Sequence, residues 1–312
     1  MRSTPYQRDE SAAWDVARPP RHIQRPGADM TGVDMAGFRV TGPRAGDLRV
    51  VPHPAVMLVL EFGTSRSVVD DGAGRRHRGS VVAGPGFGFG GTVRASADQV
   101  ECVQVRLSPL IARAVLGVSP AELTGSAVPL DDLWGREAAR MCERLGEVPS
   151  WQGRFALAGA LLAGRRQARS PVDPEVAWAW DQIMASRGRA RIDRLALELG
   201  WSRKRLWSRF RAQTGMPPKQ AAKLIRFDHA VHRLVAGDGV AQVAADGGYF
   251  DQSHLHRDVL AFTGATPSAV VSEPFLTVDV RAWPTEGGAP PERFPERFPE
   301  RFPERFPERF PE

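Results

Sequence analysis

The sequence predicts an α+β protein with two globular units, a β-rich first domain and an all-helical second domain. Short segments with strand character, separated by Gly, Pro and Asp, occupy the first third of the chain, which is typical of a sandwich or barrel. Beyond Ser170 nearly every segment has helical spacing. A chain of 312 residues, of which 42% are hydrophobic, can bury two separate cores.

The strands of the first domain are recognised by their alternation. Val103, Val105 and Leu107 alternate with Gln104 and Arg106, which is the period of a half-buried antiparallel strand, and we expect a strand over 99–107. Shorter strands are expected at 38–40, 48–51, 55–62, 67–69 and 80–83.

The pattern then becomes helical. Ser108 followed by Pro109 is a cap and first-turn signal for a helix that runs to Leu116. Two more helices, at 136–145 and 151–169, complete a connector to the second domain.

Composition sets the domain boundaries. Ser170, Pro171 and Pro174 mark a linker, and from Glu292 the unit Glu-Arg-Phe-Pro occurs five times, which forbids a continuous helix or a central strand. The expected regions are a flexible arm at 1–25, a β-rich sensor or dimerisation domain with its helical connector at 26–170, a helical domain at 171–273 and a disordered tail at 274–312.

Positive charge is concentrated in the second domain. The net charge is +6, and the stretch from Arg187 to Arg226 holds twelve Arg or Lys residues against only Asp193 and Glu198. Such a distribution favours a polyanionic partner. Within the stretch, Gly200 can end a helix that carries Leu195 and Leu199, and Ser202 can cap the next, in which Leu206 and Phe210 face the core.

The same arrangement returns about fifty residues later. Gly247 and Gly248 follow a short apolar helix, and Asp251 can cap a helix whose core side carries Leu255, Val259 and Phe262. A helix of about nineteen residues, Pro218 to Ala236, lies between the two pairs and is roughly 28 Å long. Two helix-turn-helix units about one turn of DNA apart are therefore predicted.

At these residues the sequence resembles the AraC/XylS family of transcription activators. The resemblance rests on 192–200, on 201–215 and above all on the stretch Gly248-Tyr-Phe-Asp-Gln-Ser-His-Leu-His-Arg257, which is followed by Phe262-Thr-Gly-Ala-Thr-Pro-Ser268. It covers about one hundred residues and implies two units that each insert a helix into the major groove. The sequence departs from the family pattern at two places. Val259, Leu260 and Ala261 stand where family members usually have an aromatic and a basic residue, so the second unit is expected to hold the DNA backbone more weakly than the first. Arg209, in the first unit, occupies a position that is usually apolar.

The resemblance, together with the outward faces of the two helices, implies the site residues. Base-reading roles fall on Lys204, Trp207, Ser208, Gln252, Ser253, His256 and Arg257. Phosphate contacts fall on Arg203, Arg205 and Arg211. The alternatives are that these arginines form a solvated helix face and that Trp207 belongs to the core.

Other motifs are weaker. Two histidine pairs, His254 with His256 and His229 with His232, are candidate metal ligands. No Cys or nearby carboxylate completes a tetrahedral set of ligands, so no metal or other cofactor is expected. The stretch from Gly86 to Gly91 formally matches a dinucleotide fingerprint, yet no βαβ unit surrounds it, and a turn between strands is favoured. Cys102 and Cys142 are interpreted as buried small hydrophobes, with a redox switch as the alternative.

The first domain resembles the cupin-like sensor domains that often accompany such modules. His53 and His77 are isolated and do not form a cupin metal site, and no acid, base and nucleophile constellation stands out, so the protein is not expected to be an enzyme. Phe87 and Phe89 are candidate effector-binding residues. The alternative function is a cupin-like small-molecule-binding protein or enzyme whose basic helices bind a protein partner.

The expected main partner is double-stranded promoter DNA. RNA polymerase, a small-molecule effector and a second copy of the chain are further candidate partners. No apolar run spans a bilayer, and the start of the chain lacks the apolar segment of a signal peptide, so a cytoplasmic protein without membrane association is expected.

Overall fold

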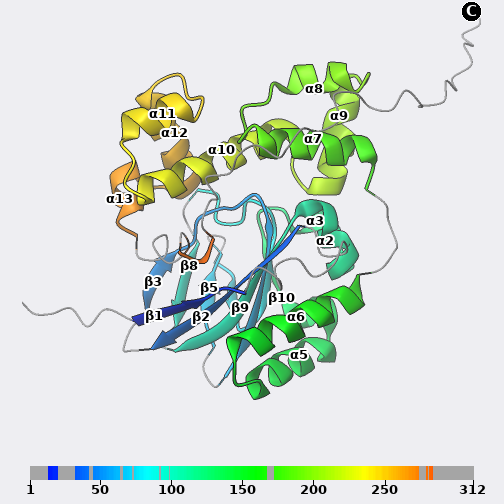
Figure 1. Ribbon diagram of the computed structural model, residues 1–312, viewed down its shortest axis with the longest axis vertical. Helices are drawn as coiled ribbons and strands as arrows, with labels where there is room; N and C mark the ends of the chain where they lie inside the picture. Colours follow the sequence, from blue (N-terminus) through cyan, green and yellow to red (C-terminus); the bar gives the residue numbers. More distant parts are fainter. Residues whose placement is uncertain are drawn as a thin grey trace, which may run out of the picture.

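The first domain is a sandwich of two antiparallel sheets, and a helical domain lies over one end of it (Figure 1). The computed structural model describes residues 13–19, 32–41, 45–63, 66–71, 74–90, 93–97, 99–166, 172–273, 279 and 281–283. Strands β1 (Ala13–Ala17), β2 (Val33–Thr41), β9 (Val100–Leu107), β4 (Val56–Phe62), β7 (Val81–Ala83) and β10 (Ala127–Pro129) form a six-stranded sheet in this order. Strands β3 (Ala45–Arg49), β8 (Arg94–Ala97), β5 (Val68–Asp70) and β6 (Arg76–Arg78) form the second.

Alternation along the strands sorts the side chains onto the two faces of the larger sheet. Leu58 and Leu60 on β4 pair with Val105 and Val103 on β9, and all four pack into a core with the helices that cover this face. Phe38 and the opposite Cys102 lie on the other face, between the sheets. The prediction of a β-rich sandwich is confirmed.

The helices of the first domain follow the strands in the chain. They are α2 (Pro109–Leu116), α3 (Pro120–Leu123), α4 (Leu130–Trp134), α5 (Arg136–Glu147) and α6 (Trp151–Arg165). Ser108 caps α2 as expected, since its side chain accepts a hydrogen bond from the amide of Leu110. Leu145 and Phe155 are fully buried against the sheet and place α5 and α6 on its outer face (Figure 1).

The second domain contains only helices among its described residues. They are α7 (Pro174–Ala185), α8 (Ile192–Glu198), α9 (Arg203–Thr214), α10 (Pro218–Val235), α11 (Val240–Asp246), α12 (Gln252–Thr263) and α13 (Pro267–Val271). Helix α10 runs between the pair α8–α9 and the pair α11–α12 (Figure 1). Of the helices in the described ranges, none combines the length and apolarity needed to cross a bilayer.

Two expectations at the ends of the chain need correction. The flexible arm at 1–25 is wrong for 13–17, because β1 pairs along its whole length with β2. The disordered tail from 274 is wrong for Asp279 and Trp283, which are buried against the first domain. The Glu-Arg-Phe-Pro repeats lie outside the described residues, as do Ser170 and Pro171 of the expected linker, while Pro174 is the first residue of α7.

Candidate DNA-binding surface and domain interface

The first helix-turn-helix unit consists of α8 and α9. Gly200 adopts a left-handed conformation between them (φ 63°). Ser202 then caps α9, because its hydroxyl accepts a hydrogen bond from the amide of Arg205 at 3.2 Å. Leu206 and Phe210 are completely buried and fix the rotation of α9 about its axis. The opposite face of α9 is left in solvent.

The predicted DNA-contacting residues of α9 lie on that solvent face. Trp207 is 46% exposed, which excludes the core interpretation of this side chain. The guanidinium of Arg211 lies over the Trp207 ring at 5.1 Å, and that of Arg205 over the Trp201 ring at 4.5 Å. The remaining members of the predicted set, Arg203, Lys204 and Ser208, are exposed as well.

The second unit repeats this construction with α11 and α12. Gly248 is left-handed (φ 72°), and the Asp251 carboxylate accepts a hydrogen bond from the amide of His254 at 2.7 Å. Leu255, Val259 and Phe262 are completely buried. The predicted base-reading residues of this unit, Gln252, Ser253, His256 and Arg257, are all exposed.

A basic groove lies between the two units. Its lining includes Arg191, Arg203, Lys219 and Lys223. The sequence interpretation missed Asp258, which lies in the same groove and is buried. Its carboxylate binds Lys223 at 3.1 Å and Arg226 at 3.2 Å and thereby ties α12 to α10. These ion pairs therefore fix α12 against the central helix.

The first domain contacts the C-terminal ends of α9 and α12. At α9, the hydroxyl of Thr124 donates a hydrogen bond to the carbonyl of Gly215 at 2.7 Å. At α12, the amide of Gly90 donates to the carbonyl of Phe262 at 3.0 Å, and the rings of Phe89 and Phe262 meet edge to face with centroids 4.8 Å apart. Arg49 donates to the carbonyl of Thr263 at 2.6 Å. These contacts leave uncovered the exposed faces of α9 and α12, which carry the predicted DNA-contacting residues.

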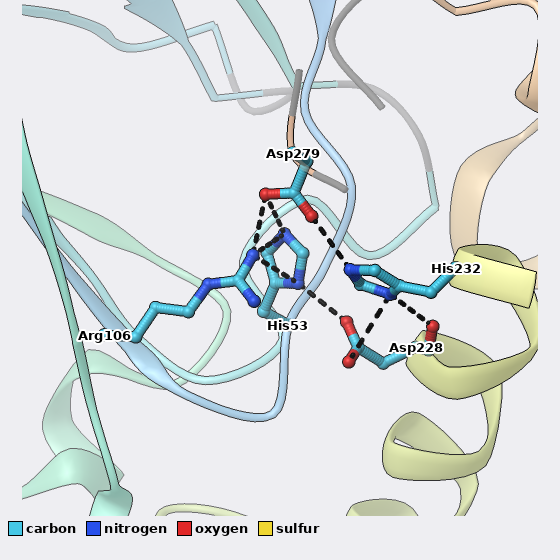
Figure 2. Close-up of polar contacts among 5 residues, drawn as sticks. All are labelled: His53, Arg106, Asp228, His232 and Asp279. Atoms are coloured by element: carbon cyan, nitrogen blue, oxygen red, sulfur yellow. Dashed lines mark hydrogen bonds and ion pairs between the residues drawn. The ribbon is translucent and has the colours of Figure 1, made fainter. Parts of the chain in front are cut away.

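A buried ionic cluster joins the domains at the C-terminal half of α10 (Figure 2). Arg106 on β9 donates a hydrogen bond to Asp279 at 2.7 Å. His232 on α10 approaches the second Asp279 oxygen at 3.3 Å, and Nδ1 of His53 lies 2.8 Å from the carboxylate of Asp228, also on α10. The cluster thus connects three distant segments: the sandwich, the central helix and the residues that follow the helical domain.

Electrostatics within the cluster favour the charged forms. The pKa of His232 is raised to about 9, because the attraction of Asp228 and Asp279 outweighs the desolvation that would lower it. The pKa of the Asp279 carboxyl lies well below its usual range, since the charges of Arg106, His53 and His232 overcome its desolvation. The sequence interpretation treated His53 as isolated and assigned Asp279 to the tail, so it missed this cluster. Among the described residues, no group of His, Cys, Asp and Glu has a metal-binding arrangement.

A largely apolar cavity of about 130 Å³ lies inside the sandwich. Its wall includes Phe87 and His53. Phe89 does not belong to this wall: its ring is 48% exposed and contacts Phe262 instead. The assignment of Phe89 to effector binding is therefore corrected, because the left-handed Gly88 (φ 89°) between the two phenylalanines turns the chain.

The glycine-rich segment and the cysteines have structural explanations. Gly86, Gly88 and Gly90 all have positive φ and form turns between antiparallel strands rather than a nucleotide-binding βαβ unit. Cys102 and Cys142 are buried, and burial raises the pKa of both thiols. Low thiolate content disfavours a redox switch.

Comparison with known proteins supports the assignment of the second domain. Residues 195–272 match the family model for a helix-turn-helix domain. No curated protein matches the chain in sequence. Among solved structures, ToxT from Vibrio cholerae is 10% identical over 79% of this chain and 98% of its own, with a TM-score of 0.43.

Two further solved structures are similar to parts of the chain. The C-terminal domain of AraT, a response regulator from Geobacillus stearothermophilus, is 20% identical over 33% of this chain and 87% of its own, with a TM-score of 0.31. Oxalate decarboxylase from Bacillus subtilis is 14% identical over 40% of this chain and 41% of its own, with a TM-score of 0.19. The matched helix-turn-helix model, the two capped helix pairs and their exposed basic faces identify the chain as a DNA-binding transcription regulator whose helix-turn-helix domain covers residues 195–272.

Proposed function

We propose that the protein binds promoter DNA by inserting α9 and α12 into successive major grooves on one side of the duplex. The observation that carries the proposal is that both helices are capped at their N-termini and expose the predicted reading residues. Helix α10, with 18 residues, is roughly 27 Å long. It therefore separates the two helices by a distance comparable with one DNA turn, about 34 Å.

Base reading and phosphate binding are assigned to different residues. Arg257 is exposed on α12 and can form two parallel hydrogen bonds with a guanine edge, while Gln252 suits adenine. Trp207 can contact a thymine methyl group from α9. Arg203, Arg205 and Arg211 bind phosphates, and Lys219 in the groove extends this backbone contact between the units.

DNA selection followed by salt titration tests the proposal. Purified full-length protein would be used to select sequences from random double-stranded DNA. A preferred site whose affinity falls steeply with salt is expected, because phosphate binding releases counterions. A protein that selects no sequence, or whose DNA binding is insensitive to salt, would favour the alternative in which the basic helices bind a protein partner.

We further propose that the first domain senses a small molecule in its cavity. The cavity of about 130 Å³ is mainly apolar with a few polar groups in its wall, which is the usual composition of a small-molecule site. Two elements connect the cavity to DNA reading. His53 lies in the wall and contacts Asp228 on α10, and Phe87 belongs to the loop whose Phe89 contacts α12.

Effector control would be tested by screening metabolite-sized compounds for an increase in the melting temperature of the protein. Compounds that stabilise it would then be added during DNA titrations. We expect some of them to change DNA affinity. If stabilising compounds leave DNA affinity unchanged, the first domain serves dimerisation alone. We also propose that the protein acts in the cytoplasm and that RNA polymerase and a second copy of the chain are further partners.

A further inference from the structure

The chemical class of the effector follows from the walls of the cavity, and this inference rests on the sensor role proposed above. The cavity lies between the two sheets, with Val59 on β4 facing it from one sheet and Ala95 on β8 from the other. Its surface is mainly apolar. Dry apolar cavities of roughly 150 Å³ hold a benzene ring, so a cavity of about 130 Å³ fits a ligand with one small ring or a branched chain.

Glu61 is the acidic residue in the wall of the cavity. Glu61 is only 1% exposed, and no Lys or Arg occurs among the described residues that line the cavity. The two nitrogens of His53 face Asp228 and Asp279 in the domain interface rather than serving as free cationic groups. Gln104 and Ser67 supply neutral polar atoms. Glu61 is therefore the one acidic side chain among the described residues of the wall, and no Lys or Arg of the wall balances it.

The carboxylate of Glu61 retains capacity to accept a hydrogen bond. It accepts one from the amide of Ser67 at 3.1 Å and one from the Ser67 hydroxyl, while a carboxylate offers about four acceptor positions. The guanidinium of Arg66 donates to the backbone carbonyl of Glu61 at 3.2 Å. Burial raises the pKa of the Glu61 carboxyl despite these neighbours. An additional donor inside the cavity would stabilise the ionised form.

We propose that the cavity binds a small apolar molecule whose single polar group donates a hydrogen bond to the Glu61 carboxylate, with a protonated amine preferred over a hydroxyl and a carboxylate rejected. The amine provides a positive charge for a buried negative group, and charge-assisted hydrogen bonds are the stronger kind. A carboxylate ligand would place a second anion beside Glu61 in a poorly solvated space whose described wall residues include no Lys or Arg, while the nearby Arg66 guanidinium already donates to the Glu61 backbone carbonyl.

Three matched probes test the class: benzylamine, benzyl alcohol and benzoate. Each would be titrated into full-length protein without DNA at neutral pH, by isothermal titration calorimetry and ligand-observed NMR. Benzylamine should bind most tightly, benzyl alcohol more weakly and benzoate at least about tenfold more weakly than benzylamine. Benzoate binding as tight as that of benzylamine would overturn the proposal, and so would the absence of saturable binding by all three.

Variants locate the binding. Glu61→Gln should lower benzylamine affinity by roughly tenfold and change benzyl alcohol affinity less, whereas Glu101→Gln, which lies outside the cavity and pairs with Arg39, should change neither. Val59→Phe should abolish benzylamine binding because the larger side chain fills the cavity. If this variant does not fold, Ala95→Leu, which fills the cavity from the opposite sheet, should have the same effect. Unchanged benzylamine binding in Glu61→Gln would contradict the assignment.

The test separates this inference from the proposed function. These titrations contain no DNA, so they test ligand binding alone. If the protein binds benzylamine and the ligand leaves its DNA affinity unchanged in a separate titration, the inferred ligand class is correct and the proposed sensor role is wrong. If only acidic compounds change the DNA affinity of the protein, the proposed sensor role is correct and the inferred ligand class is wrong.

Discussion

Asp279 accepts a 2.7 Å hydrogen bond from Arg106, which precedes it by 173 positions. The contact fastens the chain that follows the helical domain back onto β9 of the sandwich. Trp283 strengthens the attachment, because the Arg106 guanidinium also lies over its ring at 4.3 Å. The described residues after α13 thus help to hold the two domains together at the C-terminal half of α10.

Replacing Asp279 with Asn should loosen the domain interface. The change leaves Arg106 and His232 with buried positive charges that lack a carboxylate, and breaking a buried ion pair costs about 3 to 5 kcal/mol. Urea denaturation and limited proteolysis between the domains would measure the loss. Asp238→Asn is the matched control, because Asp238 pairs with Arg233 and is 39% exposed, so its replacement should cost at most about 1 kcal/mol. Equal effects of both variants would contradict a special role for Asp279.

Stability should also fall between about pH 6.5 and pH 9 through His232. Its pKa is raised in the folded protein to about 9 from 6.5. Its contribution is therefore complete below pH 6.5 and is lost as pH rises through 9. The groups that face it are Asp228 and Asp279 directly, with His53 and Arg106 behind them.

The size of this effect follows from linkage and amounts to a few kcal/mol at most. Free energies of unfolding would be measured from urea curves at several pH values for the wild type and for His232→Gln. The variant should be less stable at pH 6.5 and should show a flatter profile up to pH 9. A wild-type profile as flat as that of the variant would mean that His232 does not gain its proton on folding.

Local signals explain why the helical domain was predictable from sequence. Ser202 and Asp251 cap the helices that begin directly after them, and such caps involve residues within three positions of each other. The exposed faces of α9 and α12 follow from helical spacing once Leu206 and Leu255 are buried. Strands β6 (Arg-His-Arg) and β8 (Arg-Ala-Ser-Ala) were missed because they lack the β-branched and aromatic residues that signal a strand.

The ionic cluster could not be predicted in the same way. His53 and Asp228 are 175 positions apart, and neither carries a local signal for the other. The single detectable clue was Asp228 four residues before His232 on one helix, a spacing that places the two on one face. Their partners depend on how the domains dock, which no periodicity encodes.

The helical domain should fold and bind DNA without the first domain. Its buried core draws nearly all its members from residues 176–270, with Val51 as the contribution from the sandwich. A fragment of residues 171–273 should therefore show helical circular dichroism and salt-sensitive binding to the DNA selected by the full chain. A folded fragment that does not bind this DNA would show that the first domain completes the reading surface.

Replacing Phe89 with Ala should uncouple ligand binding from DNA binding. The ring lies outside the cavity wall and contacts Phe262 on α12, and such an aromatic pair contributes about 0.5 to 1.5 kcal/mol. Benzylamine affinity should stay unchanged, while its effect on DNA affinity should shrink. Met184→Ala, an exposed site on α7, is the control and should retain the full effect. If the Phe89 variant responds to ligand like the wild type, the loop does not transmit the signal.

Arg257 and Arg211 should differ in what they contribute to DNA binding. Arg257 is exposed on α12, where the buried Leu255 and Val259 set its direction, and Arg257→Ala should cost about 1 to 3 kcal/mol on the preferred site and relax the preference at one base pair. Arg211 lies in the last turn of α9 over the Trp207 ring, where a phosphate is the expected partner. Arg211→Ala should weaken binding to all sequences about equally and lower the salt slope by about one.

Titrations on preferred and scrambled DNA at several salt concentrations separate the two roles. Arg194 provides a control, because it is 77% exposed and already pairs with Glu198 on α8. Arg194→Ala should change affinity by no more than a few tenths of a kcal/mol, as neutral surface sites do. If Arg257→Ala weakens both DNAs equally, Arg257 binds the backbone rather than a base, because a lost base contact penalises only the sequence that supplied it. If both arginine variants behave like the Arg194 control, the exposed basic faces are solvated and another surface holds the DNA.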